Sequence, residues 1–362
     1  MCGRAQLTKS HATTWHAWRS SHYHASQATL ITVNTILTGD PLKAAAILRA
    51  GHLVAFPTET VYGLGADAFN VDAIGRIFQA KQRPLDNPLI VHVADPGQID
   101  RVVFALSPAA RILIRECFPG PVSIIAKKRP EVPSMVTGAL NTVAVRMPEH
   151  PLAQEFLRAC RTPVAAPSAN LSGRPSPTTW QAVHEDLGGR ISCLLRNGNS
   201  QVGLESTVVD CSQVVPVVLR TGAVTIERLR ELLPSLAVAD ASIDEVRSPG
   251  LLYRHYAPRA SVKLVTTPSD AMAHERSAYI GLDEPSGAFG LSQVLPSVEA
   301  YAHSFFDFFR RCEAEGIEVI YCQEVPTAGI GRALMDRLTK ASNAHVSGAT
   351  APDAATARHR PF

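Results

Sequence analysis

Residues 81–92, K-Q-R-P-L-D-N-P-L-I-V-H, connect a predicted helix to a predicted strand. Pro84 restricts Arg83 to an extended or turn conformation, so the preceding helix should end here. Residues 89–91, L-I-V, form a short apolar run that is typical of a buried strand. Lys81 and Arg83 are therefore separated by one residue in a proline-braced connection. Two cations held in this way suit a phosphate or carboxylate ligand, whereas a solvated surface turn is the alternative interpretation.

The pattern on both sides of this connection is one of alternating strands and helices, which indicates an α/β fold. Residues 28–233 carry the alternation and are predicted to form the larger domain. Residues 261–342 repeat it on a smaller scale and are predicted to form a second α/β domain. The length of 362 residues favours two domains, and 46% apolar with 19% charged residues is typical of a globular protein.

The region between the two domains, residues 234–260, lacks an apolar period and is predicted to be a linker. It contains S-P-G-L-L-Y-R-H-Y-A-P at 248–258, and such aromatic and cationic side chains are unusual in a spacer. The segment therefore fits a lid over a site, and the small domain is expected to hold it there. Residues 1–27 are predicted to be a disordered extension and residues 343–362 a frayed tail.

Polar loops follow two predicted strands of the larger domain. Residues 52–56 form one strand, and P-T-E-T-V-Y-G-L-G at 57–65 is too rich in hydroxyl groups, Gly and Pro to be a core element. The strand that begins V-A-A-P-S-A-N (164–170) breaks at its proline and leads into G-R-P-S-P (173–177). Open α/β sheets bind ligands beside strand ends. The loops therefore predict a ligand site, although an ordinary turn is the alternative for residues 57–65.

The net charge of +3 resides in the first 39 residues, which hold three basic side chains and no acid. The neutral remainder gives no electrostatic argument for nucleic-acid binding. The acid-free composition of the extension also fits an organellar transit peptide or a start codon assigned too early. Its four histidines match no defined site spacing, and no metal ligands are predicted in the chain.

Cysteine usage bears on the compartment. The seven cysteines are scattered, their number is odd, and no C-x-x-C pair occurs. This usage favours a reduced, cytoplasmic compartment with mostly buried, structural thiols. No apolar run approaches the length of a membrane span.

The predicted small domain has two features of its own. Residues 298–315 form an amphipathic helix with four phenylalanines, which are expected to lie in the core. Gly329-Ile330-Gly331 lies between a predicted strand and helix, as a dinucleotide-binding turn would. Because the third glycine of such a turn is missing, a structural turn is the favoured interpretation.

Six motifs, taken in order, resemble those of the threonylcarbamoyl-AMP synthase family in its two-domain form. They are F-P-T-E-T-V-Y-G-L-G (56–65), K-Q-R-P-L-D-N-P-L-I-V-H (81–92), T-V-A-V-R-M-P (142–148), A-A-P-S-A-N (165–170), E-S-T (205–207) and S-P-G-L-L-Y-R-H-Y-A-P (248–258). The resemblance runs from about residue 28 to 344. It implies a YrdC-like domain with a twisted open sheet, joined by a linker to a smaller Rossmann-like α/β domain.

The resemblance also implies a reaction. L-threonine, bicarbonate and ATP, with Mg²⁺ bridging the phosphates, would give L-threonylcarbamoyl-AMP and pyrophosphate. A separate transferase would then use the product to modify the adenosine beside the anticodon of certain tRNAs. Weak or no direct tRNA binding is therefore expected of this chain.

The site residues that the resemblance implies fall into three sets. The catalytic set is Lys81, Arg83, Ser168 and Asn170. The ATP-binding set is Arg83, Asn87, Thr142, Ser168, Ser176, Arg220 and Tyr253. The L-threonine-binding set is Thr60, His92, Arg146, Ala166 and Ser206. One conservative departure is V-S-I-I at 122–125, where relatives often carry a Leu-Thr pair.

The residue types fit this chemistry because both reactants are anions. Lys81, Arg83 and Arg220 would neutralise phosphate charge, and the planar fork of Arg146 suits the threonine carboxylate. No Ser–His–Asp or Cys–His arrangement is evident, so catalysis is expected to rest on positioning and electrostatics. His92 is expected to bind rather than to act as a base.

Two other functions fit parts of the same pattern. A carbamoyltransferase that makes a carbamoyl-adenylate shares the domain, but such proteins usually carry additional modules for which this chain has no room. A non-catalytic RNA-binding module would use the same cations for RNA phosphates. The neutral body of the chain argues against that alternative.

Overall fold

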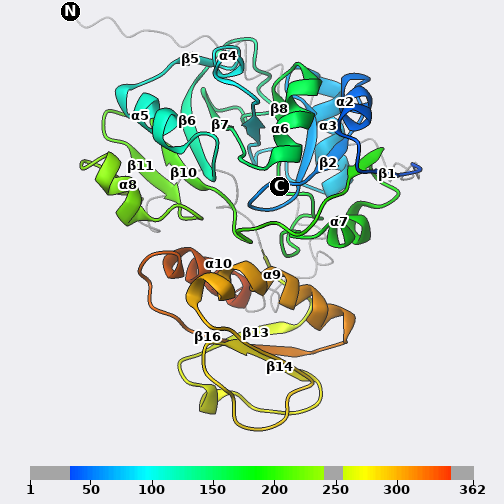
Figure 1. Ribbon diagram of the computed structural model, residues 1–362, viewed down its shortest axis with the longest axis vertical. Helices are drawn as coiled ribbons and strands as arrows, with labels where there is room; N and C mark the ends of the chain where they lie inside the picture. Colours follow the sequence, from blue (N-terminus) through cyan, green and yellow to red (C-terminus); the bar gives the residue numbers. More distant parts are fainter. Residues whose placement is uncertain (1–32, 240–255, 344–362) are drawn as a thin grey trace, which may run out of the picture. The chain divides into compact units, whose positions relative to one another are not determined.

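The computed structural model describes residues 33–239 and 256–343 of the chain, which form two β-sheets with flanking helices (Figure 1). The predicted α/β fold with two domains is confirmed. Most of the predicted linker, together with the N-terminal extension and the C-terminal tail, lies outside the described residues. In the described part of the chain, no helix is long and apolar enough to cross a membrane.

The larger sheet contains twelve strands within the described residues. They are β1 (Ile36–Thr38), β2 (Val54–Phe56), β3 (Gly63–Asp67), β4 (Ile90–His92), β5 (Val103–Ala105), β6 (Val122–Lys128), β7 (Thr142–Arg146), β8 (Val164–Ala165), β9 (Cys193–Leu195), β10 (Thr207–Asp210), β11 (Val217–Arg220) and β12 (Ala237–Val238). The order is β1-β9-β2-β3-β8-β4-β7-β6-β10-β11-β12, with β5 paired to β6. The sheet is mixed, because it contains parallel pairs such as β4 with β7 and antiparallel pairs such as β3 with β8.

The helices of this domain begin where a short polar side chain accepts a hydrogen bond from the first turn. They are α2 (Pro41–Arg49), α3 (Val71–Lys81), α4 (Pro96–Ile99), α5 (Pro108–Cys117), α6 (Pro151–Cys160), α7 (Trp180–Leu187) and α8 (Ile226–Leu232). Their caps are Asp40, Asn70, Asp95, Ser107, His150, Thr179 and Thr225. Such caps satisfy N–H groups that have no partner within the helix.

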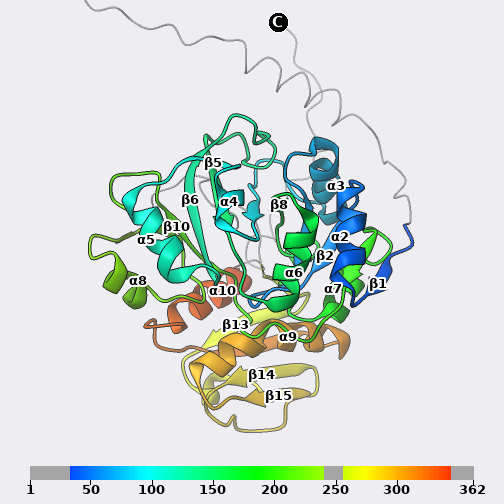
Figure 2. The same cartoon turned by 45° about the horizontal axis from the view of Figure 1, so that its top comes forward.

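Helices cover both faces of the sheet because alternate residues of a strand point to opposite sides. In β2, Val54 packs in a cluster with residues of α2 and α6, while Ala55 packs in a cluster with residues of α3 and α7. The helices α2 and α6 lie side by side (Figure 2). Because both faces are buried, the strands are short apolar runs instead of alternating ones.

The smaller sheet has four parallel strands among the described residues, in the order β13-β16-β14-β15. They are β13 (Ser261–Val265), β14 (Ser277–Gly281), β15 (Leu291–Val294) and β16 (Val319–Gln323), with helices α9 (Val298–Ala314) and α10 (Gly331–Asn343) and a short 3-10 helix (Pro268–Asp270). The four phenylalanines of α9 are fully buried, as predicted. This parallel sheet fits the Rossmann-like domain that the motifs implied.

At the carboxyl ends of these parallel strands, polar groups are hydrogen-bonded to one another within the small domain. Gln323 accepts hydrogen bonds at its Oε1 from the backbone N–H groups of Leu282 and Asp283 and from the hydroxyl of Tyr279. Its Nε2 donates to Asp283 Oδ2 at 2.6 Å. In the Gly-Ile-Gly turn, the backbone N–H of Gly331 donates to the backbone oxygen of Ala328 at 3.1 Å, and a Cβ atom on Gly331 would lie 2.2 Å from the backbone oxygen of Pro326, as suits a structural turn.

The glycine-rich stretch at 57–65 is not a loop throughout, which corrects the prediction. Residues from Gly63 onward form β3, which pairs antiparallel with β2 and places Ala55 opposite Leu64. A Cβ atom on Gly65 would lie 2.8 Å from Val164 Cγ1 and 3.1 Å from Phe56 Cε1. The glycine is therefore present because the strand packs too closely for a side chain.

Three boundaries also differ from the sequence-based expectation. The helix α3 includes Lys81 and ends at Gln82, which adopts a left-handed conformation with φ of 53°. The sequence predicts Thr178 as the cap of a helix that reaches about residue 187, whereas the cap of α7 is its neighbour Thr179. The sheet continues into residues 237–238, which fall inside the predicted linker and pair with β11.

Candidate active site

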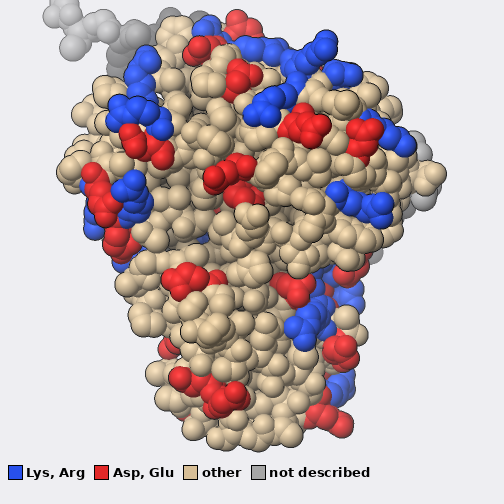
Figure 3. Space-filling view, viewed as in Figure 1, with Lys and Arg blue, Asp and Glu red and all other residues tan. Residues whose placement is uncertain are grey.

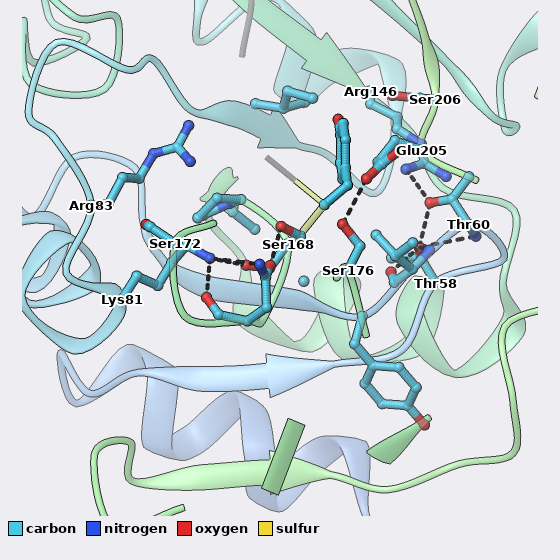
Figure 4. Close-up of a pocket in the computed structure, with 18 of the residues that line it drawn as sticks. Thr58, Thr60, Lys81, Arg83, Arg146, Ser168, Ser172, Ser176, Glu205 and Ser206 are labelled. Carbon is cyan, nitrogen blue, oxygen red and sulfur yellow. Dashed lines mark hydrogen bonds between the residues drawn. The ribbon is translucent and has the colours of Figure 1, made fainter. Parts of the chain in front are cut away.

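The described residues contain a pocket that collects most of the predicted site (Figure 4). The pocket and its open mouth together hold about 770 Å³ of space. The predicted residues that line it are Thr60, Lys81, Arg83, His92, Arg146, Ala166, Ser168, Asn170, Ser176, Ser206 and Arg220. They come from loops and strand ends of the larger sheet that are far apart in the sequence.

Three predicted residues have other positions. Asn87 and Thr142 do not line the pocket. Tyr253, the linker residue expected to contact ATP, lies outside the described residues. The lining residues that no predicted set contained include Thr58, Tyr62, Ser172, Arg174, Glu205 and Tyr256. Glu205 stands in the E-S-T motif, but a carboxylate was not expected beside anionic ligands.

Lys81 holds the loop that follows β8. Its Nζ donates to the backbone oxygen of Ser168 at 2.5 Å, to the backbone oxygen of Asn170, and to Asn170 Oδ1 at 3.4 Å. The side chain is buried, and burial followed by the neighbouring Arg83 lowers the pKa of the Lys81 ammonium. With its three N–H donors directed to this loop, Lys81 sets the position of the S-x-N residues.

Those loop residues also hold each other. Ser168 Oγ donates to Asn170 Oδ1 at 2.5 Å, and Asn170 Nδ2 donates to the backbone oxygens of Leu171 and Arg174 at 2.8 Å each. The K-x-R and S-x-N motifs, which are separated by more than eighty residues, therefore form one hydrogen-bonded unit. An amide and a hydroxyl can orient a ligand here without adding charge.

Asn87 does not line the pocket itself but holds the side chain of Arg83, which does. Arg83 Nη2 donates to Asn87 Oδ1 at 2.6 Å and to the backbone oxygen of Pro88 at 2.9 Å. The Nε group donates to the backbone oxygen of Asn87 at 3.2 Å. The proline-braced connection thus fixes the guanidinium at the pocket, and the solvated-turn interpretation does not describe these contacts.

Arg146 is paired with a buried carboxylate. Its Nη2 lies 2.7 Å from Glu59 Oε1, and both side chains are about 95% buried. The Nη1 group donates to Thr60 Oγ1 at 2.8 Å and the Nε group to the backbone oxygen of Gly120 at 3.2 Å. Nε and Nη1 each donate one hydrogen bond to the chain and Nη2 is in ion-pair contact only, which leaves donors of the fork for a ligand. The Glu59 carboxylate depends on this cation for its charge balance.

Ser206 lies between Arg220 and Ser123 at the other wall. Arg220 Nη2 donates to the backbone oxygen of Ser206 at 3.0 Å and to its Oγ at 3.1 Å. The hydroxyl groups of Ser123 and Ser206 are 2.8 Å apart. Ser123 belongs to V-S-I-I, where the motif departs from its relatives, and the hydroxyl group that a threonine would supply is retained there.

His92 is a neutral group in this site. Its pKa is lowered to about 3 by burial and then by the nearby Arg146. The ring packs edge-on against Phe56 at 5.8 Å, and Nδ1 lies 3.3 Å from the backbone oxygen of Ile90. We assign the proton to Nδ1, so Nε2 is an acceptor. A base that is protonated only near pH 3 is poorly matched to proton abstraction at neutral pH.

Acid should therefore destabilise the protein through His92. The folded pKa of about 3 lies below the ordinary 6.5, so the unfolded chain binds the extra proton as the pH falls below 6.5. The free energy of unfolding therefore keeps its full value above pH 6.5. Between pH 6.5 and pH 3 it falls by up to about 1.4 kcal/mol per pH unit. Urea unfolding of wild type and His92→Gln between pH 7.5 and 5 measures the difference. Parallel pH dependences in the two proteins would contradict the prediction.

The chain matches two family models that together cover residues 46–222 and 224–343. The Sua5/YciO/YrdC family model, described as "Telomere recombination", matches residues 46–222, and the model for the threonylcarbamoyl-AMP synthase C-terminal domain matches residues 224–343. A threonylcarbamoyl-AMP synthase of Pyrococcus abyssi is 40% identical over 83% of this chain and 93% of the relative. One from Bacillus subtilis is 38% identical over 85% and 95% respectively.

A solved structure agrees with these sequence matches. The crystal structure of P. abyssi Sua5 complexed with L-threonine superposes with a TM-score of 0.80 and 38% identity, over 86% of this chain and 98% of that one. The fold and the pocket define an α/β enzyme of the nucleotidyl-transfer type. The chain belongs to the threonylcarbamoyl-AMP synthase family, which confirms the family that the motifs indicated.

Proposed function

We propose that this chain forms L-threonylcarbamoyl-AMP and pyrophosphate from L-threonine, bicarbonate and ATP. The observation that carries the proposal is that a single pocket joins two cationic groups of residues. Arg146 with Thr60 and Ser206 forms one group, and the Lys81–Arg83 unit with its S-x-N loop forms the other. A solved relative contains L-threonine, which supports an amino-acid site in this fold.

The reaction needs two bonds to form. The deprotonated amine of threonine attacks the carbon of bicarbonate, water leaves, and a carbamate results. A carbamate oxygen then attacks the α-phosphorus of ATP, and the bond from that phosphorus to the bridging oxygen of pyrophosphate breaks. We assign the threonine carboxylate to Arg146 and the phosphates to Arg83 and Arg220, because planar guanidinium groups bind such oxygens in a fixed geometry.

The residues present do not form a dedicated metal site. Among the described residues, no group of three or more His, Cys, Asp or Glu side chains is placed to hold a metal ion. Mg²⁺ that is bound largely by substrate phosphates and water fits such a pocket. There it would neutralise phosphate charge, while the residues of the chain bind and orient the two reactants. Among the described residues that line the pocket, no serine or threonine hydroxyl group is hydrogen-bonded to a histidine, so we propose direct attack without a covalent enzyme intermediate.

RNA contacts are not needed for this reaction, and we propose that a separate transferase receives the product. On the face shown in Figure 3, basic and acidic side chains are interspersed, with basic ones most frequent along the upper edge. A separate acceptor enzyme is consistent with that surface and with the neutral body of the sequence.

The test is pyrophosphate release from ATP with Mg²⁺, measured with and without L-threonine and with and without bicarbonate. Release should require both, and L-serine should support less of it. Release with carbamoyl phosphate in place of threonine and bicarbonate would move the assignment to the carbamoyltransferase. Absence of release, together with salt-dependent tRNA binding, would favour an RNA-binding module.

A further inference from the structure

Arg337, on α10 of the small domain, is fully buried although it carries a charge. Its Nε lies 3.2 Å from Glu205 Oε2, and its Nη1 donates to Asp336 Oδ2 at 3.0 Å. The guanidinium carbon lies 5.6 Å from the centroid of the Tyr256 ring. A charge removed from water in this way requires close partners. One of those partners, Glu205, belongs to the lining of the pocket.

Glu205 continues the contact into the pocket. Its Oε1 accepts the hydroxyl proton of Ser176 at 2.6 Å, and Figure 4 shows the two side chains directed toward each other. Burial raises the pKa of Glu205, but Arg337 and then Arg220 hold it below its ordinary value, so the carboxylate stays charged. Because Ser176 donates its single proton to Glu205, its oxygen can only accept from a ligand.

The other helix of the small domain holds the same loop. Arg310, on α9, donates from Nη2 to the backbone oxygen of Pro175 at 2.5 Å and to Asp186 Oδ2 at 2.9 Å. That carboxylate also accepts from the backbone N–H of Leu171 at 3.2 Å. The backbone on both sides of Arg174, and the hydroxyl of Ser176, are therefore fixed by groups that depend on the small domain.

We propose that Arg337 is a positioning residue of the nucleotide site, which acts by fixing Glu205 and, through it, Ser176. The inference rests on the proposed function, in which Ser176 contacts ATP. It makes the small domain part of the machinery that recognises the nucleotide. It also implies that Ser176 accepts a hydrogen bond from a sugar hydroxyl or a base amine of the nucleotide. Ser176 would then not contact a phosphate oxygen.

The test compares the apparent KM for ATP and for L-threonine in wild type and Arg337→Met. The variant should raise the KM for ATP about tenfold or more, while the KM for L-threonine changes less than about threefold. The double variant Arg337→Met/Glu205→Gln should return the KM for ATP to within about threefold of wild type. The glutamine keeps an oxygen for Ser176 and removes the carboxylate charge that Arg337 balances.

The matched control is Arg276→Met, which removes an arginine from an exposed ion pair with Glu318 in the same domain. It should change neither KM. A wild-type KM for ATP in Arg337→Met, with only a lower melting temperature, would overturn the proposal, and so would an equal shift in the control. If the methionine variant does not fold, Arg337→Lys retains the charge and should show an intermediate KM for ATP; an unchanged value again overturns the proposal.

Equilibrium titration of ATP separates this inference from the proposed function. If wild type binds ATP but releases no pyrophosphate, the proposed function fails. The difference in ATP affinity between wild type and Arg337→Met still decides the role of Arg337. Equal ATP affinities of the two proteins would overturn the positioning role.

Discussion

Replacement of Arg146 by methionine is expected to lower kcat/KM for L-threonine about a thousandfold and to destabilise the fold. The activity falls because the guanidinium is the proposed ligand of the substrate carboxylate, and a charge placed in a buried site is worth several kcal/mol. The stability falls by about 3–5 kcal/mol because Glu59 loses its partner at 2.7 Å and stays buried. Pyrophosphate release and urea unfolding measure the two effects.

A second variant separates the two effects. Arg146→Met/Glu59→Gln removes the unpaired charge, so it should recover much of the stability and none of the activity. Arg115→Met, which alters an arginine with a 72% exposed side chain outside the pocket, should behave as wild type in both assays. If the double variant instead keeps threonine-dependent activity close to the wild-type level, the role of Arg146 is only to balance the charge of Glu59.

Replacement of Lys81 by methionine should lower ATP-dependent turnover about a hundredfold. The side chain is 1% exposed, and its ammonium donates to the backbone oxygens of Ser168 and Asn170. Each buried carbonyl that loses its donor costs about 1–3 kcal/mol, so the loop should lose its arrangement before a ligand binds. The measurement is the apparent KM for ATP and kcat, together with the melting temperature.

The matched control for Lys81 is Lys128→Met. Lys128 also donates from Nζ to a backbone oxygen, that of Val132 at 2.7 Å, but it does not line the pocket. Its replacement should reduce stability slightly and leave turnover unchanged. If Lys81→Met keeps the wild-type kcat and KM for ATP, Lys81 is not needed to organise the loop.

The sequence predicted most elements of the fold because apolar period and capping chemistry are local. Ser107 followed by Pro108, for example, is a sequence pattern typical of a helix start, and α5 begins there with Ser107 as its cap. The prediction was wrong where packing overrides composition. Gly63 and Gly65 are typical of a turn, yet both lie in the core strand β3, where Val164 and Phe56 leave no room for a Cβ atom on Gly65.

The motifs also predicted much of the pocket lining, because they carry residue types that suit anionic ligands. They did not predict which cations are already paired. Lys81 and Arg146 carry the same charge, but their partners differ. Lys81 donates to backbone carbonyl groups, whereas Arg146 is paired with the carboxylate of Glu59. Such pairings join residues that are tens of residues apart, so no local pattern reports them.

By itself, then, the sequence determined the α/β class, the two domains, the family and most of the predicted residues that line the pocket. The tertiary structure alone decided that Glu205 faces the pocket and that Arg337, from the other domain, balances its charge. The physical reason is desolvation: a buried charge must have a partner, and the partner is chosen by proximity in the fold and not by position in the chain.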